Sequence, residues 1–537
     1  MIMTLIEISC PDTRAYGVRS LSAYLRAKNK KVKIIFLPPH LEKLRSKSGD
    51  VILYSDEVIE DVLKITEDSD IVGISVLTYY YDKAIQLSNA LKKAGKIVVW
   101  GGIHATTRPE DALKVADLVI AGEAEDTLLE LYERIENGET WHGVKNLRYI
   151  KDGDLVMEPI RPLIQDLDSL PYIDHDYLQV HFVLDGHTGH IEPMTEERLK
   201  EIMSVGPLLP LGRFYHYQTM ASRGCPHNCA YCCNNIYRGM YSNQKYLRWR
   251  SWDHLFGELR DALKKMPFLN TISFFDDSFF SQPTEVIQKF AERYKKEVGL
   301  PFATQSSPQT TNEEKMKALV EAGMVYIEMG IQTGSPRISE IYHRQYSKEN
   351  VISATNAIAK FKNYMLTPDY HLILDNPWER TEDVILTLKL MLDVPKPFSL
   401  KPASLILYPG TGVYKKAISE NMVNDEYKEI YRKAFSAPYP TYLNFLIYLS
   451  SFNALPRFII RLLANPLFII IFQRKPFAPL FAVLRYFVDK GILVGRMFLR
   501  MIGLQKQGFS ELMLKGFAER FKDVLDLDTM ERKNKES

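Results

Sequence analysis

Four of the five cysteines in this chain fall within a stretch of nine residues, at Cys225, Cys229, Cys232 and Cys233. The first three are separated by four and three residues, so one short loop can wrap a cubane iron-sulfur cluster. Three thiolates satisfy three irons and leave the fourth iron open. A molecule with an amine and a carboxylate can chelate that iron and bring a sulfonium within electron-transfer reach. The spacing therefore predicts a [4Fe-4S] cluster whose chemistry depends on the open iron.

A zinc site is the alternative for this loop, because Cys233 or His227 could complete a tetrahedral set of ligands. Structural zinc sites usually consist of two separated pairs of ligands, and the sequence has no second cysteine pair. Cys233 directly follows Cys232, so its side chain points away from any cluster that Cys232 faces. We therefore expect Cys233 to be a packed thiol and not a fourth ligand.

The bulk composition favours a folded, multidomain protein that acts on small molecules. The chain has 537 residues, of which 46% are hydrophobic and 25% charged, and a formal net charge of +2. We therefore expect about three domains and no nucleic-acid partner. Cys10 stands alone near the start, and clustered cysteines do not make a disulfide framework. Residues 1–10 show no basic leader or small-residue cleavage site, so we expect a reducing cytoplasm.

The first 140 residues alternate short β-rich runs with amphipathic helices. The expected elements are residues 3–9, 18–28, 32–37, 58–66, 71–77, 84–93, 97–100 and 118–120. This alternation predicts an α/β domain with a doubly wound parallel sheet, Rossmann-like, over residues 1–140. Ligands of such sheets bind at the carboxyl ends of the strands. The segments expected there are residues 10–17, 77–81, 101–104 and 122–123, and the last two open with glycine, which lets a backbone approach a flat ligand closely.

Residues 141–215 show no regular period and contain several prolines, so we predict a connecting segment between two domains. His181, His187 and His190 lie close together in this segment. A metal site and a solvated loop are both compatible with these histidines. The loop is favoured because no ligand spacing repeats.

A second alternation of strands and helices covers residues 216–425. The expected strands are residues 217–222, 271–275, 302–306, 326–331, 370–374 and 404–407, with helices between them. Six β/α units predict a partial (β/α)6 barrel, whose working face lies at the carboxyl ends of the strands. The cysteine loop follows the first of these strands, which places it on that face.

Residues 426–537 differ in composition from the rest of the chain. Residues 442–472 and 477–504 are strongly apolar, but Arg, Lys and Pro interrupt them at short intervals. No uninterrupted run reaches the roughly 18 to 20 apolar residues that a membrane-spanning helix needs. We therefore predict a helical region without a transmembrane anchor. Basic amphipathic helices that lie on a membrane or line a hydrophobic channel are alternatives to a helical cap packed on the barrel.

The Cys-x3-Cys-x2-Cys loop, with Tyr231 before its last cysteine, resembles the signature of the radical S-adenosylmethionine (radical SAM) superfamily. Further segments resemble this family in the same order along the chain: residues 274–277 (Phe-Phe-Asp-Asp), 305–307 (Gln-Ser-Ser), 328–335 (Glu-Met-Gly-Ile-Gln-Thr-Gly-Ser) and 408–411 (Tyr-Pro-Gly-Thr). The resemblance covers residues 220–422. It implies that Cys225, Cys229 and Cys232 are the cluster ligands.

The same resemblance implies contacts to S-adenosylmethionine (SAM). Asp276 and Asp277 occupy the place of contacts to the methionyl amine, and acidic side chains suit an ammonium group. Gln332 occupies the ribose-contacting place, which is often a glutamate in relatives, and Tyr231 would lie near the adenine. Ser306 is a further implied contact. Structural roles are the alternative, since paired aspartates can cap the following helix.

The front domain resembles the cobalamin-binding domain found before many radical SAM barrels, through residues 70–75 (Asp-Ile-Val-Gly-Ile-Ser), 101–106 (Gly-Gly-Ile-His-Ala-Thr) and 117–125. It lacks the Asp-x-His-x-x-Gly loop that supplies an axial histidine in other cobalamin proteins. The resemblance therefore implies cobalamin held by backbone and shape, without histidine coordination of the cobalt. The implied contacts are Thr78, Tyr79, Gly101, Gly102, His104, Gly122 and Glu123. A flavodoxin-like fold without cofactor is the alternative.

Together the resemblances imply a cobalamin-dependent radical SAM enzyme that cleaves SAM reductively to a 5′-deoxyadenosyl radical and modifies an unactivated carbon. C-methylation of a hydrophobic small molecule or lipid is the leading outcome, and ring formation or rearrangement in tetrapyrrole, isoprenoid or natural-product biosynthesis is the alternative. A corrinoid or redox sensor without catalysis is an alternative of another class. A methylthiotransferase acting on RNA would need a second cysteine trio, and Cys10 is alone in the front domain.

The same reading implies the partners and the location of the protein. We expect a reductant such as flavodoxin or ferredoxin, because the cluster must receive an electron. We expect a cytoplasmic location. Peripheral contact with the inner face of the membrane, through the apolar and basic C-terminal region, is a further option.

Overall fold

The computed structural model describes residues 1–8, 15–38, 53–204, 214–344, 346–433, 437–453 and 455–488. The chain forms two compact units. The first consists of residues 1–224, 231–269 and 407–434, and the second of residues 225–230, 270–406 and 435–537. The division between the units therefore passes through the cysteine loop.

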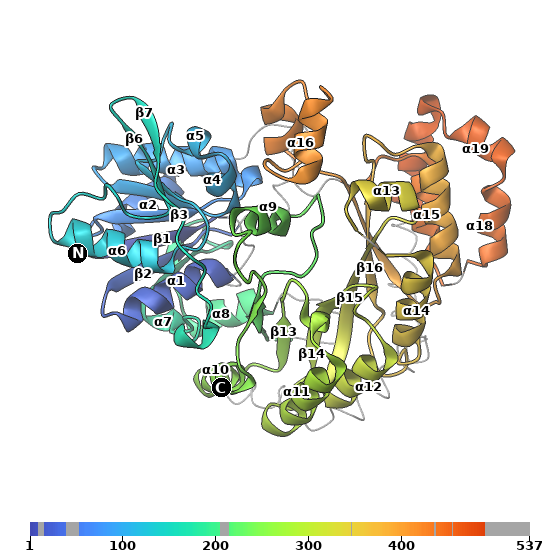
Figure 1. Cartoon of the computed structure of the whole chain (residues 1–537), viewed down its shortest axis with the longest axis horizontal. Coiled ribbons are helices and arrows are strands. Elements are labelled where there is room, and N and C mark those ends of the chain that lie inside the picture. Colours follow the sequence, from blue (N-terminus) through green and yellow to red (C-terminus); the bar gives the residue numbers. More distant parts are fainter. Residues whose placement is uncertain are drawn as a thin grey trace. The chain divides into compact units, whose positions relative to one another are not determined.

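The first unit contains a nine-stranded sheet in the order β7-β6-β5-β4-β3-β1-β2-β8-β9. Its central strands are parallel and largely buried: β1 (Ile2–Glu7), β2 (Lys31–Phe36), β3 (Ile71–Ser75), β4 (Ile97–Gly101) and β5 (Leu118–Ile120). Helices α1 (Tyr16–Ala27), α2 (Asp56–Ile65), α3 (Tyr81–Lys93) and α6 (Glu125–Glu136) lie beside the sheet (Figure 1). Buried apolar strands covered by helices are typical of parallel sheets. The predicted Rossmann-like domain is confirmed.

Four further strands extend this sheet on both sides. They are β6 (Leu147–Lys151), β7 (Asp154–Met157), β8 (His181–Leu184) and β9 (Ile191–Pro193), and α8 (Glu196–Met203) follows. The sequence predicts a connecting segment here, because strands of three to five residues are too short to show a period. The solvated loop predicted for the histidines is wrong for His181, which is buried in β8 with Nε2 3.2 Å from a carboxylate oxygen of Asp174. His187 is exposed, with Nε2 2.7 Å from Glu201.

The second unit is built on five parallel strands that follow one another in chain order. They are β13 (Thr271–Phe274), β14 (Phe302–Ser306), β15 (Met324–Gln332), β16 (Asp369–Leu374) and β17 (Ser399–Ser404). Helices α11 (Thr284–Glu297), α12 (Glu313–Ala322), α14 (Lys348–Ala359) and α15 (Thr381–Asp393) alternate with them. The other expected strand, β10 (His216–Thr219), precedes the cysteine loop and belongs to the first unit. The alternation of strands and helices predicted for the barrel is confirmed.

The last strand lies earlier than predicted. The sequence predicts residues 404–407, whereas β17 covers Ser399–Ser404 and contains Pro402. Proline is normally excluded from a strand because it lacks the N–H that a ladder needs. β17 is the edge strand of its sheet, so Pro402 is tolerated there and hides the strand from a pattern search.

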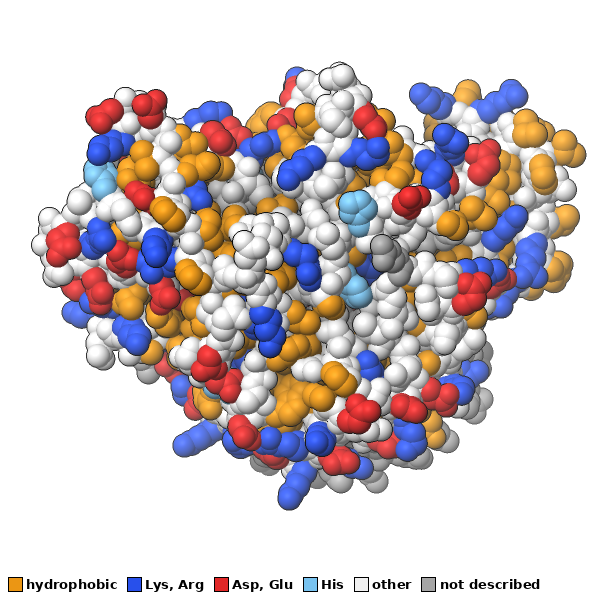
Figure 2. Space-filling model, viewed as in Figure 1, with side chains coloured by type: hydrophobic (Ala, Val, Ile, Leu, Met, Phe, Trp, Pro, Cys, Tyr) orange, Lys and Arg blue, Asp and Glu red, His pale blue; other side chains and the backbone are white. Residues whose placement is uncertain are grey.

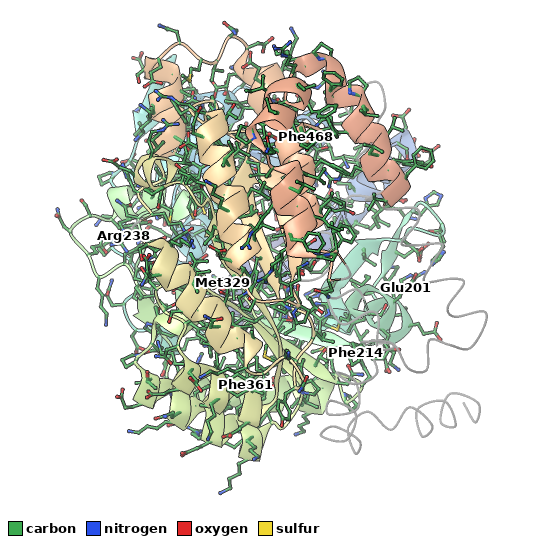
Figure 3. The ribbon with its side chains drawn as sticks, turned by 90° about the vertical axis from the view of Figure 1, so that its right-hand side faces the viewer. Glu201, Phe214, Arg238, Met329, Phe361 and Phe468 are labelled. Carbon is green, nitrogen blue, oxygen red and sulfur yellow. The ribbon has the colours of Figure 1, made fainter. Side chains whose placement is uncertain are left out.

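The C-terminal region is helical, as predicted. Its described helices are α17 (Tyr442–Ser450), α18 (Arg457–Leu463), α19 (Pro466–Phe472) and a segment that reaches Val488. Figure 2 shows hydrophobic side chains gathered together with Lys and Arg side chains over α18 and α19, and Figure 3 labels Phe468 on α19. No single described helix is long and apolar enough to span a membrane; one pair, Pro466–Phe472 with Lys475–Val488, meets that test jointly but is bent by 80°. The rest of the apolar stretch 477–504, from residue 489 on, lies outside the described residues.

Candidate active site

The cysteine loop runs from β11 (Ser222–Arg223) to α9 (Cys233–Met240). Gly224 opens it with φ +89°, and a Cβ there would lie 2.6 Å from the backbone oxygen of Tyr246, so only glycine fits this turn. Cys225 and Cys229 are buried and Cys232 is half-buried. The prediction of a packed thiol at Cys233 is wrong, because Cys233 begins α9 and its side chain is exposed.

Residues 225–230 are fixed against strand-end segments of the second unit. Cys225 Sγ lies 3.9 Å from the backbone oxygen of Asp277, just after β13. Cys229 Sγ lies 3.5 Å from Nη1 of Arg344, and the next residue, Ala230, donates its N–H to the carbonyl oxygen of Tyr342. Two of the three predicted ligands therefore lie at the carboxyl ends of the barrel strands, where the sequence predicts the working face.

Arg344 is a site residue that the sequence analysis missed. Its second nitrogen, Nη2, donates to the carbonyl oxygen of Gly330 at 2.6 Å. The guanidinium thus bridges β15 and the cysteine loop and brings a positive charge to a predicted cluster ligand. It follows the short helix α13 (Pro336–Ile341) without any motif around it, so only the folded chain reveals it.

The predicted SAM contacts in the second unit lie on or just after the strand ends, with different exposure. Asp276 is fully buried, whereas Asp277 is exposed. Ser306 is half-buried, and its Oγ donates to the backbone oxygen of Glu328 at 3.4 Å. Gln332 has φ +67°, a conformation that non-glycine residues rarely adopt and that often marks a functional site. Tyr231, the fifth predicted contact, is half-buried and belongs to the first unit.

Several buried polar atoms near these strand ends have no hydrogen-bond partner of ordinary geometry within the described residues. Among them are Oε1 of Gln332, Nδ2 of Asn376 and Oε1 of Glu379. Buried polar groups are normally paired, and unpaired ones mark a functional or ligand site. Burial and the neighbouring charge of Asp375 raise the pKa of Glu379 to about 7, so this carboxyl is partly protonated near neutral pH. The set fits a ligand rich in donors and acceptors, such as the amino-acid and ribose groups of SAM.

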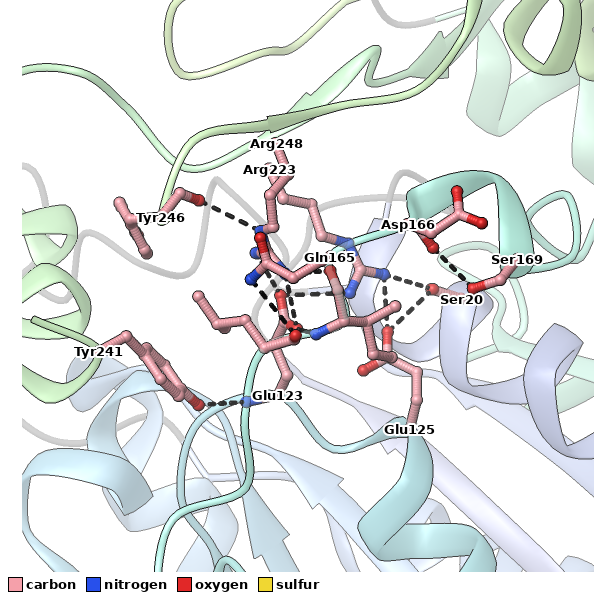
Figure 4. A network of polar contacts seen from close by, with 12 residues as sticks. Ser20, Glu123, Glu125, Gln165, Asp166, Ser169, Arg223, Tyr241, Tyr246 and Arg248 are labelled. Carbon is pink, nitrogen blue, oxygen red and sulfur yellow. Dashed lines mark hydrogen bonds and ion pairs between the residues drawn. The ribbon is translucent and has the colours of Figure 1, made fainter. Parts of the chain in front are cut away.

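In the first unit, the segments on both sides of the cysteine loop are tied to residues 122–125 (Figure 4). Arg223 Nη2 lies 2.6 Å from Oε1 of Glu125 and 2.9 Å from Ser20 Oγ. Arg248 pairs with both carboxylate oxygens of Glu123, at 2.7 and 3.0 Å. Burial alone would raise the pKa of Glu125, but the charge and hydrogen bond of Arg223 lower it below its usual range. The base of the loop is therefore held by charge pairs to the front domain.

Replacing Glu125 by alanine should lower the free energy of unfolding by about 3 kcal/mol, because Arg223 would keep a largely buried charge without its main partner. Urea unfolding of Glu125→Ala against the unchanged protein measures this. Asp126→Ala is the matched control, since Asp126 is exposed and its carboxylate accepts a hydrogen bond from the Tyr24 hydroxyl at 2.6 Å. That loss should stay below about 1 kcal/mol, and equal losses in the two variants would contradict the role given to Glu125.

The residues predicted to contact cobalamin lie mostly at the carboxyl edge of the first sheet. Gly102 has φ +92°, and a Cβ there would lie 2.9 Å from the backbone oxygen of Val76. Gly122 has φ +83°, and a Cβ there would lie 2.0 Å from the hydroxyl of Tyr241, at the end of α9. Glycine is required at both positions. Protein atoms therefore fill the side-chain position at both glycines, whereas nothing lies within 4 Å of a Cβ at Gly101, so the backbone there is open to a flat ligand.

The side chains of the other predicted contacts differ in how available they are. Thr78 is buried and Tyr79 half-buried, and Gly101 has no atom within 4 Å of a Cβ position. The carboxylate of Glu123 is already paired with arginines. Residues 10–14 of this predicted edge lie outside the described residues.

His104 faces the protein interior. Its ring is fully buried among Tyr81, Trp100 and Tyr431, with Nδ1 3.3 Å from the hydroxyl of Thr78. Burial lowers the pKa of His104 to about 4, so the ring is neutral at physiological pH. In this conformation His104 can meet a ligand at the sheet edge only through its backbone.

Two family models match the chain. The radical SAM superfamily model matches residues 220–387, and the B12 binding domain model matches residues 9–132. Both ranges fall in the regions where the sequence shows the corresponding resemblance.

Known proteins are similar to this chain over most of its length. An uncharacterized methyltransferase of Pyrococcus horikoshii is 29% identical over 385 residues, which cover 69% of this chain and 74% of that protein. The cobalamin-dependent S-adenosylmethionine radical enzyme OxsB, solved with aqua-cobalamin and SAM bound, has a TM-score of 0.65 at 15% identity, over 97% of this chain and 84% of that chain. The radical SAM methyltransferase TsrM from Kitasatospora setae has a TM-score of 0.58 at 15% identity, over 78% of this chain and 76% of that chain.

At such identities the solved structures show the fold, and the family models show which domains are present. The B12-binding domain precedes the radical SAM domain, as the sequence predicts. The chain is therefore a radical SAM enzyme with a B12-binding domain, and its cofactors are a [4Fe-4S] cluster, SAM and cobalamin.

Proposed function

We propose that this enzyme transfers a methyl group to an unactivated carbon of a hydrophobic small molecule or lipid. The observation that carries the proposal is in the first unit, where α9 begins directly after Cys232 and is followed by Tyr241, whose hydroxyl lies against Gly122 and Glu123. One short helix thus connects a predicted cluster ligand with the loop predicted to contact cobalamin. Such a connection suits a reaction in which both cofactors act on one substrate carbon.

The residues of this chain bind and position the reactants in this proposal. When bound, the cluster and SAM supply the radical that removes a hydrogen atom, and cobalamin supplies the methyl group. Cys225, Cys229 and Cys232 would hold three irons of the cluster, and the fourth iron would be free to bind the amine and carboxylate of SAM. The buried polar atoms of Gln332, Asn376 and Glu379 bind the polar groups of SAM and keep them oriented.

An apolar substrate agrees with the exposed surface next to this site. Phe275 follows β13, lies directly before Asp276, and is large, apolar and exposed. Exclusion of water by apolar groups protects a carbon radical from side reactions. The support for a hydrophobic substrate is thus the character of this surface, together with the apolar C-terminal region.

A low-potential flavodoxin or ferredoxin is the proposed electron donor, since the enzyme requires an external reductant. The proposed location is the cytoplasm, because exposed Cys233 and an open cluster both need a reducing environment.

Anaerobic reconstitution with SAM carrying a deuterated methyl group tests the function. The protein is purified without oxygen. Corrinoid is extracted from one sample and identified, and candidate hydrophobic substrates are added with a reductant to another sample. We expect bound corrinoid, 5′-deoxyadenosine and a substrate that has gained the labelled methyl group. Formation of 5′-deoxyadenosine together with an unlabelled, rearranged or cyclised product would contradict methylation and support the alternative, ring formation or rearrangement. Bound corrinoid without any 5′-deoxyadenosine would indicate a sensor.

A further inference from the structure

The helices at the end of the described chain expose large apolar side chains. They are α18, α19 and the helical segment from Lys475 to Val488, all in the second unit. Phe458, Leu462, Leu467, Ile470, Tyr486 and Phe487 are each between 58% and 69% exposed. We call these six residues the apolar face. Clustered exposure of this kind marks an interaction site, because isolated apolar residues are the norm on soluble surfaces.

The same helices already bury a different set of apolar side chains. Ile460, Ile469 and Phe481 are buried. The ring of Phe481 lies 5.1 Å from that of Tyr442 on α17. A helix that packs on a soluble protein normally has a polar outer side, whereas helices that are apolar on both sides are typical of a buried or membrane environment. The apolar face is therefore a second hydrophobic surface and not the core side of these helices.

The chain segment that carries the apolar face has charges of one sign. The chain contains no Asp or Glu between Glu429 and Asp489. The cations of the three helices and their connections are Arg457, Arg461, Arg474, Lys475 and Arg485. Of these, Arg461 lies 3.4 Å from Asp393 and is otherwise exposed. Exposed apolar side chains among cations, without acidic residues, are the composition of helices that bind anionic lipid surfaces.

We infer that the apolar face docks on the surface of an anionic phospholipid bilayer and lies in the plane of the headgroups. α18 and α19 have seven residues each, so each is about 10 Å long and too short to span the roughly 30 Å hydrocarbon core. The apolar side chains enter the boundary between headgroups and acyl chains, and the cations contact lipid phosphates. The 80° bend after α19 keeps both helical segments at the interface.

Two proteins could also cover the apolar face: the remaining C-terminal part of this chain, or a second copy of the chain. Charge makes both of them poorer partners than an anionic bilayer. Residues 489–537 contain eight acidic and ten basic residues, so this part of the chain adds net positive charge instead of neutralising the cations. A second copy of the chain would bring the same cations to the same surface. An anionic bilayer offers both the missing charge and an apolar phase.

Vesicle flotation of the full chain tests this inference, and it requires neither cofactors nor activity, so its outcome is independent of the proposed methyl transfer. The protein is mixed with vesicles of phosphatidylcholine alone, or of phosphatidylcholine with phosphatidylglycerol, and separated on a density gradient. We expect flotation with the anionic vesicles and at least about tenfold less with neutral vesicles or in high salt. A full chain that does not float with anionic vesicles overturns the inference.

A matched pair of variants identifies the surface. Phe458→Ser, Leu467→Ser and Ile470→Ser combined should reduce flotation at least about tenfold, because three inserted side chains become polar. Ile150→Ser, Met157→Ser and Leu178→Ser combined form the control, as these apolar residues of the first unit are exposed to a similar degree. Circular dichroism confirms that both variants fold. Equal flotation of the two variants overturns the inference. So does a concentration-dependent dimer of the unchanged protein that is lost only in the first variant.

Discussion

Alanine at Cys225, Cys229 or Cys232 is expected to remove the iron-sulfur absorption and to reduce 5′-deoxyadenosine formation to background. If the predicted assignment holds, each of these thiolates binds one iron, and the loss of one leaves that iron without its ligand. Loss of a residue that merely supports a metal ligand typically costs about 10-fold to 100-fold in affinity or activity, and loss of a ligand should exceed that. Three measurements on protein kept free of oxygen check this: the iron content, the visible charge-transfer absorption of the cluster, and the amount of 5′-deoxyadenosine formed.

Cys233 provides the internal control for this prediction. It is adjacent to Cys232 and exposed, so Cys233→Ala removes a thiol from the same turn without removing a ligand. This variant should keep its iron and its deoxyadenosine formation. If Cys233→Ala loses the cluster while one of the other three keeps it, the assignment of ligands from the spacing is wrong.

Local patterns were sufficient to predict the cysteine loop and most of the strands. Buried parallel strands such as β4 and β5 form continuous apolar runs, and a short loop that wraps a cluster needs its ligands close together in sequence. Both kinds of feature are determined by neighbouring residues. They therefore remain visible without any knowledge of tertiary contacts.

Residues that act through distant partners could not be found in this way. Arg223 and Glu125 are 98 residues apart, and Arg344 and Cys229 are 115 apart. Hydrophobic periodicity reports burial of a segment and not which segments meet, so it carries no signal for such pairs. Asn376 and Glu379 were missed for the same reason, since their unpartnered atoms become evident only when the surrounding side chains are placed.

Arg344→Gln is expected to lower the midpoint potential of the cluster by on the order of 100 mV. The guanidinium lies 3.5 Å from Cys229 Sγ, and its positive charge stabilises the electron that the cluster gains on reduction. One unit charge at roughly 5 Å and an effective dielectric of about 20 contributes about 3 kcal/mol, which corresponds to that shift for one electron. A titration followed by electron paramagnetic resonance, without SAM or substrate, measures it.

Two further variants separate charge from geometry at this position. Arg344→Lys keeps the charge but loses the second hydrogen bond to Gly330, so it should recover part of the potential. Arg337→Gln removes a nearby arginine whose guanidinium pairs with Asp383, and it should leave the potential unchanged. An unaltered potential in Arg344→Gln would mean that Arg344 only fixes the loop to β15. A lowered potential that lysine partly restores would mean that the chain uses this charge to make the cluster easier to reduce, and thereby to make SAM cleavage accessible to a biological reductant.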